Sequence, residues 1–284
     1  MIRKSYNNGP ALYLVPTPIG NLEDITIRSL NTLKSVDVIL CEDTRESGKL
    51  LKKYDITKKL ISCHEFNEDK VKEAVIKFLK EGKNIALITD QGTPIISDPG
   101  VVVVREVIKN NYSVISLPGA TAFVPALTMS GFDPSPFIFY GFLNFKSAKR
   151  KNELEVLKHY PMTIILYEAP HRIEKTLTDI LDVFGDREIA LVRELSKVHE
   201  EIRKGKVTDL LKDIDSIKGE LVLIVEGSKE ENDFSQISLV EHVKLYLDEI
   251  GEKDAIKKVA KERKIPKSVV YKEYHTEKKK IEKE

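Results

Sequence analysis

The sequence predicts an α/β protein in which two strand-and-helix domains precede a small helical extension. Short apolar runs recur through the first 225 residues, and helical patterns lie between them. Continuous apolar runs are typical of strands covered on both faces, and strands that alternate with helices indicate an α/β architecture. A polar, acidic stretch separates this part of the chain from a basic C-terminus with helical patterns.

The elements of the two domains follow the apolar patterns in order. Amphipathic helices are expected at 69–81 and 172–184, where apolar side chains recur every three or four residues. The segment GFDPSP (131–136) contains one glycine and two prolines, which favours a domain boundary. We therefore predict an N-terminal α/β domain at 1–131 and a C-terminal α/β domain at 132–228. Strands are expected at 12–15, 36–40, 85–89, 114–117, 137–140, 163–167, 189–192 and 221–225.

The end of the chain is predicted to hold a linker at 229–238 and a basic, helix-turn-helix-like extension at 239–284. Helical patterns occupy 239–250, 254–264 and 267–274, and Pro266 separates the last two. Residues 253–280 contain 11 Lys or Arg and 4 Asp or Glu, a net charge of +7. The whole chain carries only +1, so any contact with nucleic acid is expected from local patches such as this one. A solvated helix surface would explain the same charge.

Composition excludes several classes of protein. Cys41 and Cys63 are too few for a disulfide framework or a cysteine zinc site, and we expect both in the core. No run approaches the roughly 20 apolar residues that span a bilayer, and none resembles a signal peptide. We expect a soluble, cytoplasmic protein without a metal site. Neither a G-x-G-x-x-G after a strand nor a P-loop motif is present, which disfavours nicotinamide enzymes and P-loop NTPases.

Four loops rich in glycine or proline follow predicted strands, at 16–21, 90–100, 118–121 and 168–172. Ligands of open α/β sheets bind outside the carboxyl ends of the strands, so these loops are expected to meet at one cleft. Ordinary βα turns are the alternative, although such turns rarely need the eleven residues of 90–100. These patterns alone predict an α/β enzyme with an unusual ligand cleft and do not identify the ligand.

Eight segments, taken in order, resemble the ribosomal RNA small subunit methyltransferase I family. The resemblance covers about residues 11–228, and the basic tail is compatible with it. The segments are LVPTPIGNLEDITIRSL (14–30), CEDTRESGKLL (41–51), HEFNE (64–68), TDQGTPIISDPG (89–100), LPGATA (117–122), YEAPHRI (167–173), RELSKVHEE (193–201) and GELVLIVEG (219–227).

The resemblance implies a tetrapyrrole-methylase fold, with S-adenosylmethionine bound in a cleft between two α/β domains, and a homodimer. It implies methylation of the ribose 2′-hydroxyl of a cytidine in the decoding region of 16S rRNA, within the 30S ribosomal subunit. The loops differ from the family pattern at Gln91 and Ile95, where smaller residues are expected, and at the pair Ala120 and Thr121. Cofactor contacts are implied at Pro18, Ile19, Asp90, Gly92, Thr93, Ala120, Thr121, Leu166, Tyr167, Gly219, Glu220 and Leu221.

The sequence offers several candidates for a general base, because a protonated ribose hydroxyl is a poor nucleophile. Asp43 is the first choice, with Glu42 beside it and Arg45 placed to bind Asp43 or a phosphate. An N-cap with a surface ion pair would give the same residues. His64, in a polar cluster, and Lys197 are weaker candidates, and a surface position explains either of them equally well.

Contacts with substrate RNA are expected from cations near the loops, for which solvated charges are again the alternative. Phe142 and Phe145, beside the basic run at 146–151, are candidates for base stacking. Two other functions remain open: the same fold and cofactor with a tetrapyrrole or protein acceptor, and a non-catalytic ribosome-assembly factor. The candidate RNA contacts are Arg28, Lys146, Lys149, Arg150, His171, Arg172 and Arg193.

Overall fold

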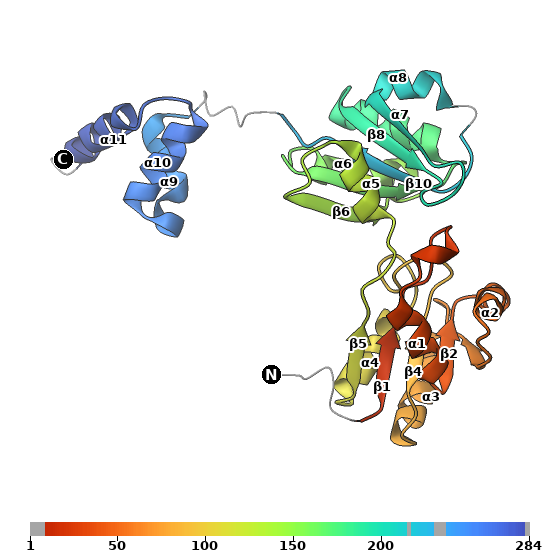
Figure 1. Ribbon diagram of the computed structural model, residues 1–284. Coiled ribbons are helices and arrows are strands. Elements are labelled where there is room, and N and C mark those ends of the chain that lie inside the picture. Colours follow the sequence, from red (N-terminus) through yellow and green to blue (C-terminus); the bar gives the residue numbers. More distant parts are fainter. Residues whose placement is uncertain (1–8, 215–216, 230–236, 282–284) are drawn as a thin grey trace. The chain divides into compact units, whose positions relative to one another are not determined.

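The computed structural model describes residues 9–214, 217–229 and 237–281. The chain forms two compact units, Met1–Gly227 and Ser228–Glu284 (Figure 1). The first unit contains two five-stranded sheets with helices, and the described part of the second contains three helices.

The first sheet is parallel throughout and is covered by helices on both faces. Its strands lie in the order β3-β2-β4-β1-β5, so the carboxyl ends of all five point to one edge. Leu33 of α1 and Leu51 of α2 pack on one face, whereas Val75 of α3 and Val107 of α4 pack on the other. The elements are β1 (Ala11–Leu14), η1 (Leu22–Asp24), α1 (Ile27–Ser35), β2 (Val38–Cys41), α2 (Thr44–Lys53), β3 (Lys59–Ser62), α3 (Glu68–Lys80), β4 (Ile85–Leu87), α4 (Val101–Lys109) and β5 (Ser113–Ser116).

The second sheet is mixed, which changes the set of loops that share one edge. Its order is β6-β7-β10-β8-β9, with β6 and β7 parallel and the remaining neighbours antiparallel. Leu221, at the start of β10, pairs with Glu168 and Arg193, at the ends of β7 and β8. The turn before β10 therefore lies beside the loops that follow β7 and β8. The elements are α5 (Phe123–Ser130), β6 (Phe137–Phe142), α6 (Ser147–Leu157), β7 (Thr163–Glu168), α7 (Ile173–Phe184), β8 (Glu188–Arg193), β9 (Glu201–Lys206), α8 (Val207–Lys212) and β10 (Leu221–Val225).

The α/β prediction is confirmed, and each of the eight predicted strands overlaps an observed strand. The two strands that the apolar runs did not reveal, β3 and β9, each lie at one edge of their sheet. In β9, half-buried and exposed residues alternate along EIRKGK. Charged residues are common on edge strands because they discourage pairing with another chain, so the pattern of a buried strand is absent there.

Helix α5 packs on the second sheet although it precedes the predicted domain boundary at 131 and 132. Ala126 and Leu127 are buried in one cluster with Val192 of β8 and Val222 of β10. Gly131 ends the helix in a left-handed conformation with φ 67°. The predicted boundary therefore separates α5 from the sheet that it packs against.

The second unit has a hydrophobic core of its own. Its helices are α9 (Leu239–Ile250), α10 (Glu252–Glu262) and α11 (Lys267–Ile281), and Val243, Val259 and Val270 are fully buried among them. Ser238 and Glu241 form a reciprocal capping box at the start of α9. Most of the predicted linker lies outside the described residues. Within the described part of the chain, no helix is both long and apolar enough to cross a membrane.

Candidate functional site

Three of the four predicted loops meet at the carboxyl edge of the first sheet and are joined to one another. Thr17 and Gly92 exchange backbone N–H···O hydrogen bonds of 2.9 and 3.1 Å. The Thr93 hydroxyl donates to the Ala120 carbonyl at 2.9 Å. A Cβ at Gly119 would lie only 2.5 Å from the Cβ of Pro16, so the glycine permits a close approach. The loops therefore form one connected surface.

A cavity of about 330 Å³ lies against this surface and is also lined by the second sheet. Its volume falls within the range of roughly 300–1,000 Å³ that is typical of small-molecule sites. Asp90, Asp98 and Glu220 are acidic residues of its lining, and Glu168 also belongs to the lining although its carboxylate is buried and bonded to Thr176 and Arg172. The whole lining consists of Ile19, Asp90, Gln91, Gly92, Thr93, Ile96, Ser97, Asp98, Thr121, Ala122, Phe142, Tyr167, Glu168, Val192, Leu195, Glu220, Leu221 and Val222.

Eight of the twelve residues implied as cofactor contacts line the cavity: Ile19, Asp90, Gly92, Thr93, Thr121, Tyr167, Glu220 and Leu221. Pro18, Ala120, Leu166 and Gly219 do not. Leu166 is 1% exposed and packs on the opposite face of its strand from Tyr167. Successive residues of a strand face opposite ways, so only one of these two side chains could reach the cavity. Any contact from Leu166 must come from its backbone.

The cavity is also lined by residues that were not among the implied cofactor contacts. Asp98 and Glu168 both belong to segments that resemble the family, 89–100 and 167–173. Val192 and Val222 come from neighbouring strands and pair with each other across the sheet. Strand alternation from Tyr167 would have placed Val222, which pairs with it, on the same face. Phe142 owes its position to an irregularity in β6 that no periodic pattern reveals.

Ile95 holds the loop 90–100 in a strained conformation. Its φ of 81° lies in the left-handed region, which a β-branched residue rarely adopts and which costs about 1–3 kcal/mol. Its side chain packs against the core beneath the loop, and a Cβ at Gly100 would lie 3.1 Å from Ile95 Cγ1. A smaller residue was expected here. The packing of the Ile95 side chain compensates this strain.

Carboxylates at the edge of the first sheet raise one another's pKa. Burial is the main reason for the raised pKa of Asp90, and the negative charge of Asp43 adds to it. Burial also raises the pKa of Asp98, with a contribution from Asp90. Glu42 is affected most broadly, since burial, Asp90 and Asp98 all raise its pKa. Such a cluster favours a cationic ligand, whose charge would relieve the repulsion.

Asp43 caps a helix and forms an ion pair, which was the alternative to its role as a base. It is the N-cap of α2, and its carboxylate accepts the Arg45 backbone N–H at 2.8 Å. The Arg45 guanidinium also donates to it at 2.7 and 3.1 Å. These hydrogen bonds hold the pKa of Asp43 well below its usual range. A carboxylate with so low a pKa is a weak base near neutral pH, so the structure favours Glu42 over Asp43 for that role.

Lys197 is unsuited to act as a base. Its ammonium group lies 3.0 Å from the Glu194 carboxylate and 3.1 Å from that of Glu220. Burial alone would lower the pKa of Lys197, but these two hydrogen bonds outweigh it and the pKa is raised. Its aliphatic stem crosses Gly20, where a Cβ would lie 2.4 Å from Lys197 Cγ. Lys197 therefore stays protonated and joins the first loop to the turn before β10.

The polar segment 64–68 divides between two roles. Glu68 is buried, and its carboxylate accepts backbone N–H groups of Gly100 and Val102 at the start of α4. This residue is a helix cap. His64 is half-buried, and its Nδ1 has no hydrogen-bond partner among the described residues. Its positive charge would lower the pKa of Glu42, so the two side chains lie near each other.

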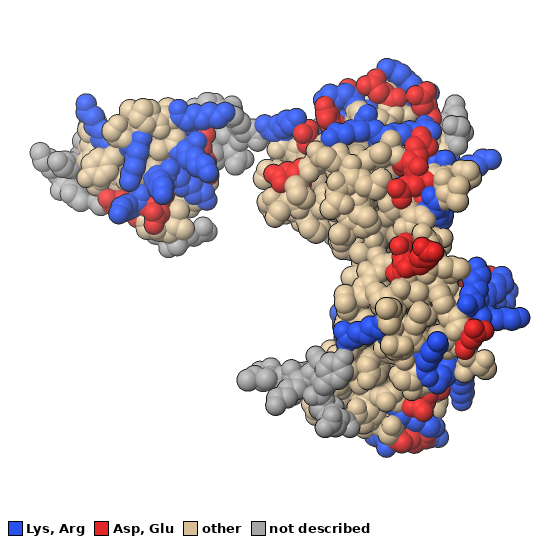
Figure 2. Space-filling model, in the orientation of Figure 1, with Lys and Arg blue, Asp and Glu red and all other residues tan. Residues whose placement is uncertain are grey.

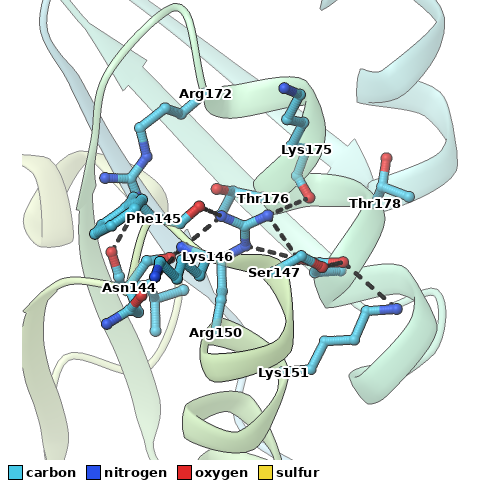
Figure 3. Close-up of polar contacts among 12 residues, drawn as sticks. Asn144, Phe145, Lys146, Ser147, Arg150, Lys151, Arg172, Lys175, Thr176 and Thr178 are labelled. Atoms are coloured by element: carbon cyan, nitrogen blue, oxygen red, sulfur yellow. Dashed lines mark hydrogen bonds and ion pairs between the residues drawn. The ribbon is translucent and has the colours of Figure 1, made fainter.

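The prediction that Arg150 contacts RNA is wrong. Arg150 is only 2% exposed, and its guanidinium lies 2.6 Å from the buried carboxylate of Asp179 (Figure 3). A phosphate could reach it only if this ion pair were broken, which is costly in the interior. Its place in a basic run of the sequence gave no sign of its burial.

The other cations proposed as RNA contacts differ in accessibility. Arg172 is half-buried, and Arg193 is engaged by the Glu201 carboxylate at 2.7 Å and by the Lys218 carbonyl at 3.1 Å. Side chains that remain exposed are those of Arg28, Lys146, Lys149 and His171.

Replacing Asp98 by asparagine is expected to raise the melting temperature of the ligand-free protein at pH 7. Because its pKa is raised, the folded state binds this proton more tightly than the unfolded chain does. The group therefore favours folding below the unfolded value of about 3.9 and loses that effect as pH rises through the raised folded value. The asparagine side chain has no charge to bury. Thermal unfolding at pH 7 and near pH 4 checks this, with Ser97→Ala as the uncharged control, and a lower melting temperature at pH 7 would contradict it.

Comparison with known proteins agrees with this geometry. The model of the tetrapyrrole (corrin/porphyrin) methylases matches residues 11–211. The chain is 48% identical over 273 residues to ribosomal RNA small subunit methyltransferase I of Bacillus subtilis strain 168, covering 93% of this chain and 94% of the relative. The protein of the same name from Haemophilus influenzae strain Rd is 44% identical over 256 residues, covering 88% and 90% respectively.

Two solved structures share the fold at low sequence identity. Uroporphyrin-III-C-methyltransferase of Thermus thermophilus is 20% identical with a TM-score of 0.54, covering 76% of this chain and 94% of that one. Diphthine synthase is 13% identical with a TM-score of 0.60, covering 76% and 90%. The chain therefore belongs to the ribosomal RNA small subunit methyltransferase I family, within the tetrapyrrole (corrin/porphyrin) methylases.

Proposed function

We propose that this protein transfers a methyl group from S-adenosylmethionine to small-subunit rRNA, and that the acceptor is the ribose 2′-hydroxyl of a cytidine in the decoding region. One observation supports this most strongly: a small cavity combines apolar walls with a cluster of carboxylates, as a cationic cofactor requires. The acceptor is argued from the relatives, which are named as ribosomal RNA small subunit methyltransferases. The proposal includes a homodimer that acts in the cytoplasm on the 30S subunit.

The residues of the cavity fit S-adenosylmethionine. Its sulfonium and ammonium groups are positive, and Asp90 and Asp98 offer negative charge to them. Its adenine requires an apolar surface, which Ile19 and Leu195 provide. When bound, the cofactor supplies an electrophilic methyl group whose leaving group is a neutral thioether.

Gly92 lets the backbone of the second loop approach the ligand. Its φ is 81°, a conformation that favours glycine, and both its N–H and its carbonyl are bonded to Thr17. A Cβ at this position would lie 3.2 Å from Cγ2 of Ile19. A side chain here would therefore press on the cavity wall as well as strain the loop.

Glu42 is the proposed general base. Its raised pKa brings it closer to neutral pH, where a base works best. It would accept the proton of the ribose hydroxyl as the oxygen forms its bond to the methyl carbon. The Asp43 backbone lowers the pKa of Asp90, so this segment lies beside the acid proposed to face the cofactor. Arg45, whose side chain is 84% exposed, is placed to meet a phosphate of the substrate.

The direct test of this function is a transfer assay with methyl-labelled S-adenosylmethionine and 30S subunits that lack the modification. We expect label in the 16S rRNA. Label in a ribosomal protein would favour the alternative of a protein acceptor. Absence of label from both, with the cofactor bound, would refute a methyltransferase acting on the small subunit.

Removal of residues 228–284 is expected to weaken RNA binding about tenfold or more at moderate salt, and to leave the cofactor affinity unchanged. The helical unit has its own core, and Lys and Arg gather on the face shown in Figure 2. The exposed cations of this unit include Lys257, Lys264, Lys267 and Lys272. Each phosphate contact that is lost should also reduce the salt dependence of binding. Filter binding at two salt concentrations measures both effects, and an unchanged RNA affinity would show that the charge is only a solvated surface.

A further inference from the structure

Two phenylalanines with largely exposed rings lie three residues apart at the end of β6, and the first of them lines the cavity. The Phe142 side chain lines the cavity and is 52% exposed, and that of Phe145 is 71% exposed. Lys146 Nζ lies 5.6 Å from the centre of the Phe145 ring. We call Phe142, Phe145 and Lys146 the aromatic platform. Large apolar rings that face water beside a binding cavity often mark a surface that another molecule covers.

A bulge in β6 aims Phe142 at the cavity. The pairing of β6 with β7 joins Phe139 to Ile165 and Phe142 to Tyr167, and the register shifts between Phe139 and Gly141. The extra residue places Phe139 and Phe142 on the same face of the sheet, which strict alternation would not allow. The Phe142 and Tyr167 rings then meet edge to face with centres 5.5 Å apart. The strand is built to present this ring.

Two arginines donate hydrogen bonds to the loop beyond the bulge (Figure 3). Arg150 Nη1 lies 3.2 Å from the Asn144 carbonyl oxygen and 3.4 Å from that of Phe145. Arg172 Nη2 donates to the Leu143 carbonyl at 2.7 Å. Three successive carbonyls thus accept from two guanidinium groups.

Buried carboxylates hold these two arginines in turn. The Arg150 Nε donates to Asp179 at 2.7 Å, and Arg172 Nε lies 3.1 Å from Glu168, which lines the cavity. The Ser147 hydroxyl donates to both oxygens of Asp179, at 3.0 and 2.9 Å. Burying such ion pairs costs desolvation free energy. Their effect here is to order the loop that carries Phe145.

We propose that the aromatic platform stacks an unpaired RNA base next to the target nucleotide, and that Arg150 is a positioning residue that holds the platform. This inference rests on the proposed function and names the surface that receives the substrate. Phe142 belongs to both the cavity wall and the platform, so a nucleotide whose ribose enters the cavity has its neighbour at Phe145. Bases of any sequence stack on exposed aromatic rings.

Charge favours RNA over a protein as the occupant. Lys146 and Lys149 are exposed and form no ion pair within the described residues, and the exposed His171 follows the strand that pairs with β6. Cations without an acidic partner beside exposed rings suit a polyanion with flat bases. On this reading Arg150 contributes by ordering the loop, and its own charge is neutralised by Asp179.

The chain contains no tryptophan, so Phe145→Trp introduces a single fluorescent reporter. We expect a short single-stranded RNA containing cytidine to quench this fluorescence, with saturation, and a duplex of the same sequence to quench it much less. Val156→Trp is the matched control, because Val156 is 69% exposed on α6 and outside the cavity lining. Absence of quenching at position 145, or equal quenching at both positions, overturns the platform. Quenching only by ribosomal protein freed of RNA also overturns it, in favour of a protein occupant.

The positioning role of Arg150 has its own readout. Arg150→Lys keeps the charge, but three donors on one nitrogen cannot reproduce the spread of bonds from three guanidinium nitrogens to Asp179 and to the carbonyls of Asn144, Phe145 and Lys175. We expect its KM for RNA to rise about tenfold, with kcat and the cofactor affinity close to wild type. Lys212→Gln removes an exposed ion pair with Asp209 on α8, away from Asp179, and should leave KM unchanged. A uniform loss of kcat, cofactor affinity and RNA affinity would show a merely structural role.

The reporter keeps this inference separable from the proposed function. Transfer of label to 16S rRNA by wild type, without quenching of the indole in the Phe145→Trp variant, would refute the platform and leave the function standing. Quenching without any methyl transfer would uphold the platform as an RNA surface and refute the proposed reaction. The fluorescence measurement needs no Arg150 variant, so poor folding of Arg150→Lys does not affect it.

Discussion

Glu42→Gln is expected to slow methyl transfer about 10²- to 10⁴-fold, the usual contribution of a general base, with little change in cofactor affinity. The side chain keeps its shape but can no longer accept a proton. In the wild type, burial together with Asp90 and Asp98 raises the pKa of Glu42. As the pH is lowered, the rate should therefore begin to fall before the ordinary glutamate pKa of about 4.3 is reached. This acidic limb should vanish in the variant. Single-turnover rates across pH, with bound cofactor, provide the measurement.

Asp43→Asn is the matched control for Glu42→Gln. Asparagine is as good an N-cap as aspartate, so α2 should keep its start while the charge is lost. Since hydrogen bonds from Arg45 already hold the pKa of Asp43 far below its usual range, we expect a change in rate of only a few fold. If Asp43→Asn were as slow as Glu42→Gln, or if Glu42→Gln kept its rate, Glu42 would not be the base.

Asp90→Ala is expected to weaken S-adenosylmethionine binding about 10- to 100-fold, the effect of losing a hydrogen bond or ion pair to a charged group in a partly enclosed site. Asp90 lines the cavity at the end of β4, and burial raises its pKa. Affinity in the wild type should therefore decline as pH falls through this raised pKa, because protonation removes the negative charge. Titration calorimetry measures both effects.

Two comparisons make the Asp90 result specific. Gln91→Ala removes an uncharged neighbour in the same wall and should change affinity much less. The product S-adenosylhomocysteine has a neutral sulfur, so an Asp90 that faces the sulfonium should matter less for the product, whereas an Asp90 that faces the ammonium should matter equally for both. Unchanged affinity for both ligands in Asp90→Ala would remove this residue from the cofactor site.

The sequence predicted the interior of the fold better than its edges. Strands such as 221–225 are apolar at every position because helices cover both of their faces. Of the four outer strands, β5 and β6 were predicted, whereas β3 and β9 lack this signal. The direction of β10 was also beyond reach, since apolar residues pack equally well in a parallel or an antiparallel strand. That direction brings Glu220 to the cavity beside Tyr167.

The site was predictable where a loop itself makes the contact, and unpredictable where the contact depends on distant residues. Gly92 and Asp90 follow a buried strand and were found from their segment. The burial of Arg150 depends on Asp179, which is 29 positions away. The contrast between Glu42 and Asp43 arises from Asp90, Asp98 and Arg45 together, so adjacent acids of one motif acquire opposite pKa shifts.

The central claim, that this cavity directs a methyl group to a ribose hydroxyl of rRNA, is tested most directly by identifying the methylated nucleoside. The 16S rRNA from the labelled 30S reaction would be digested to nucleosides and separated by chromatography with mass spectrometry. We expect label in 2′-O-methylcytidine with the wild-type protein, and little or no such label when the Glu42→Gln variant is used. Label on a nucleobase, or in no nucleoside while labelled cofactor is bound, would contradict it.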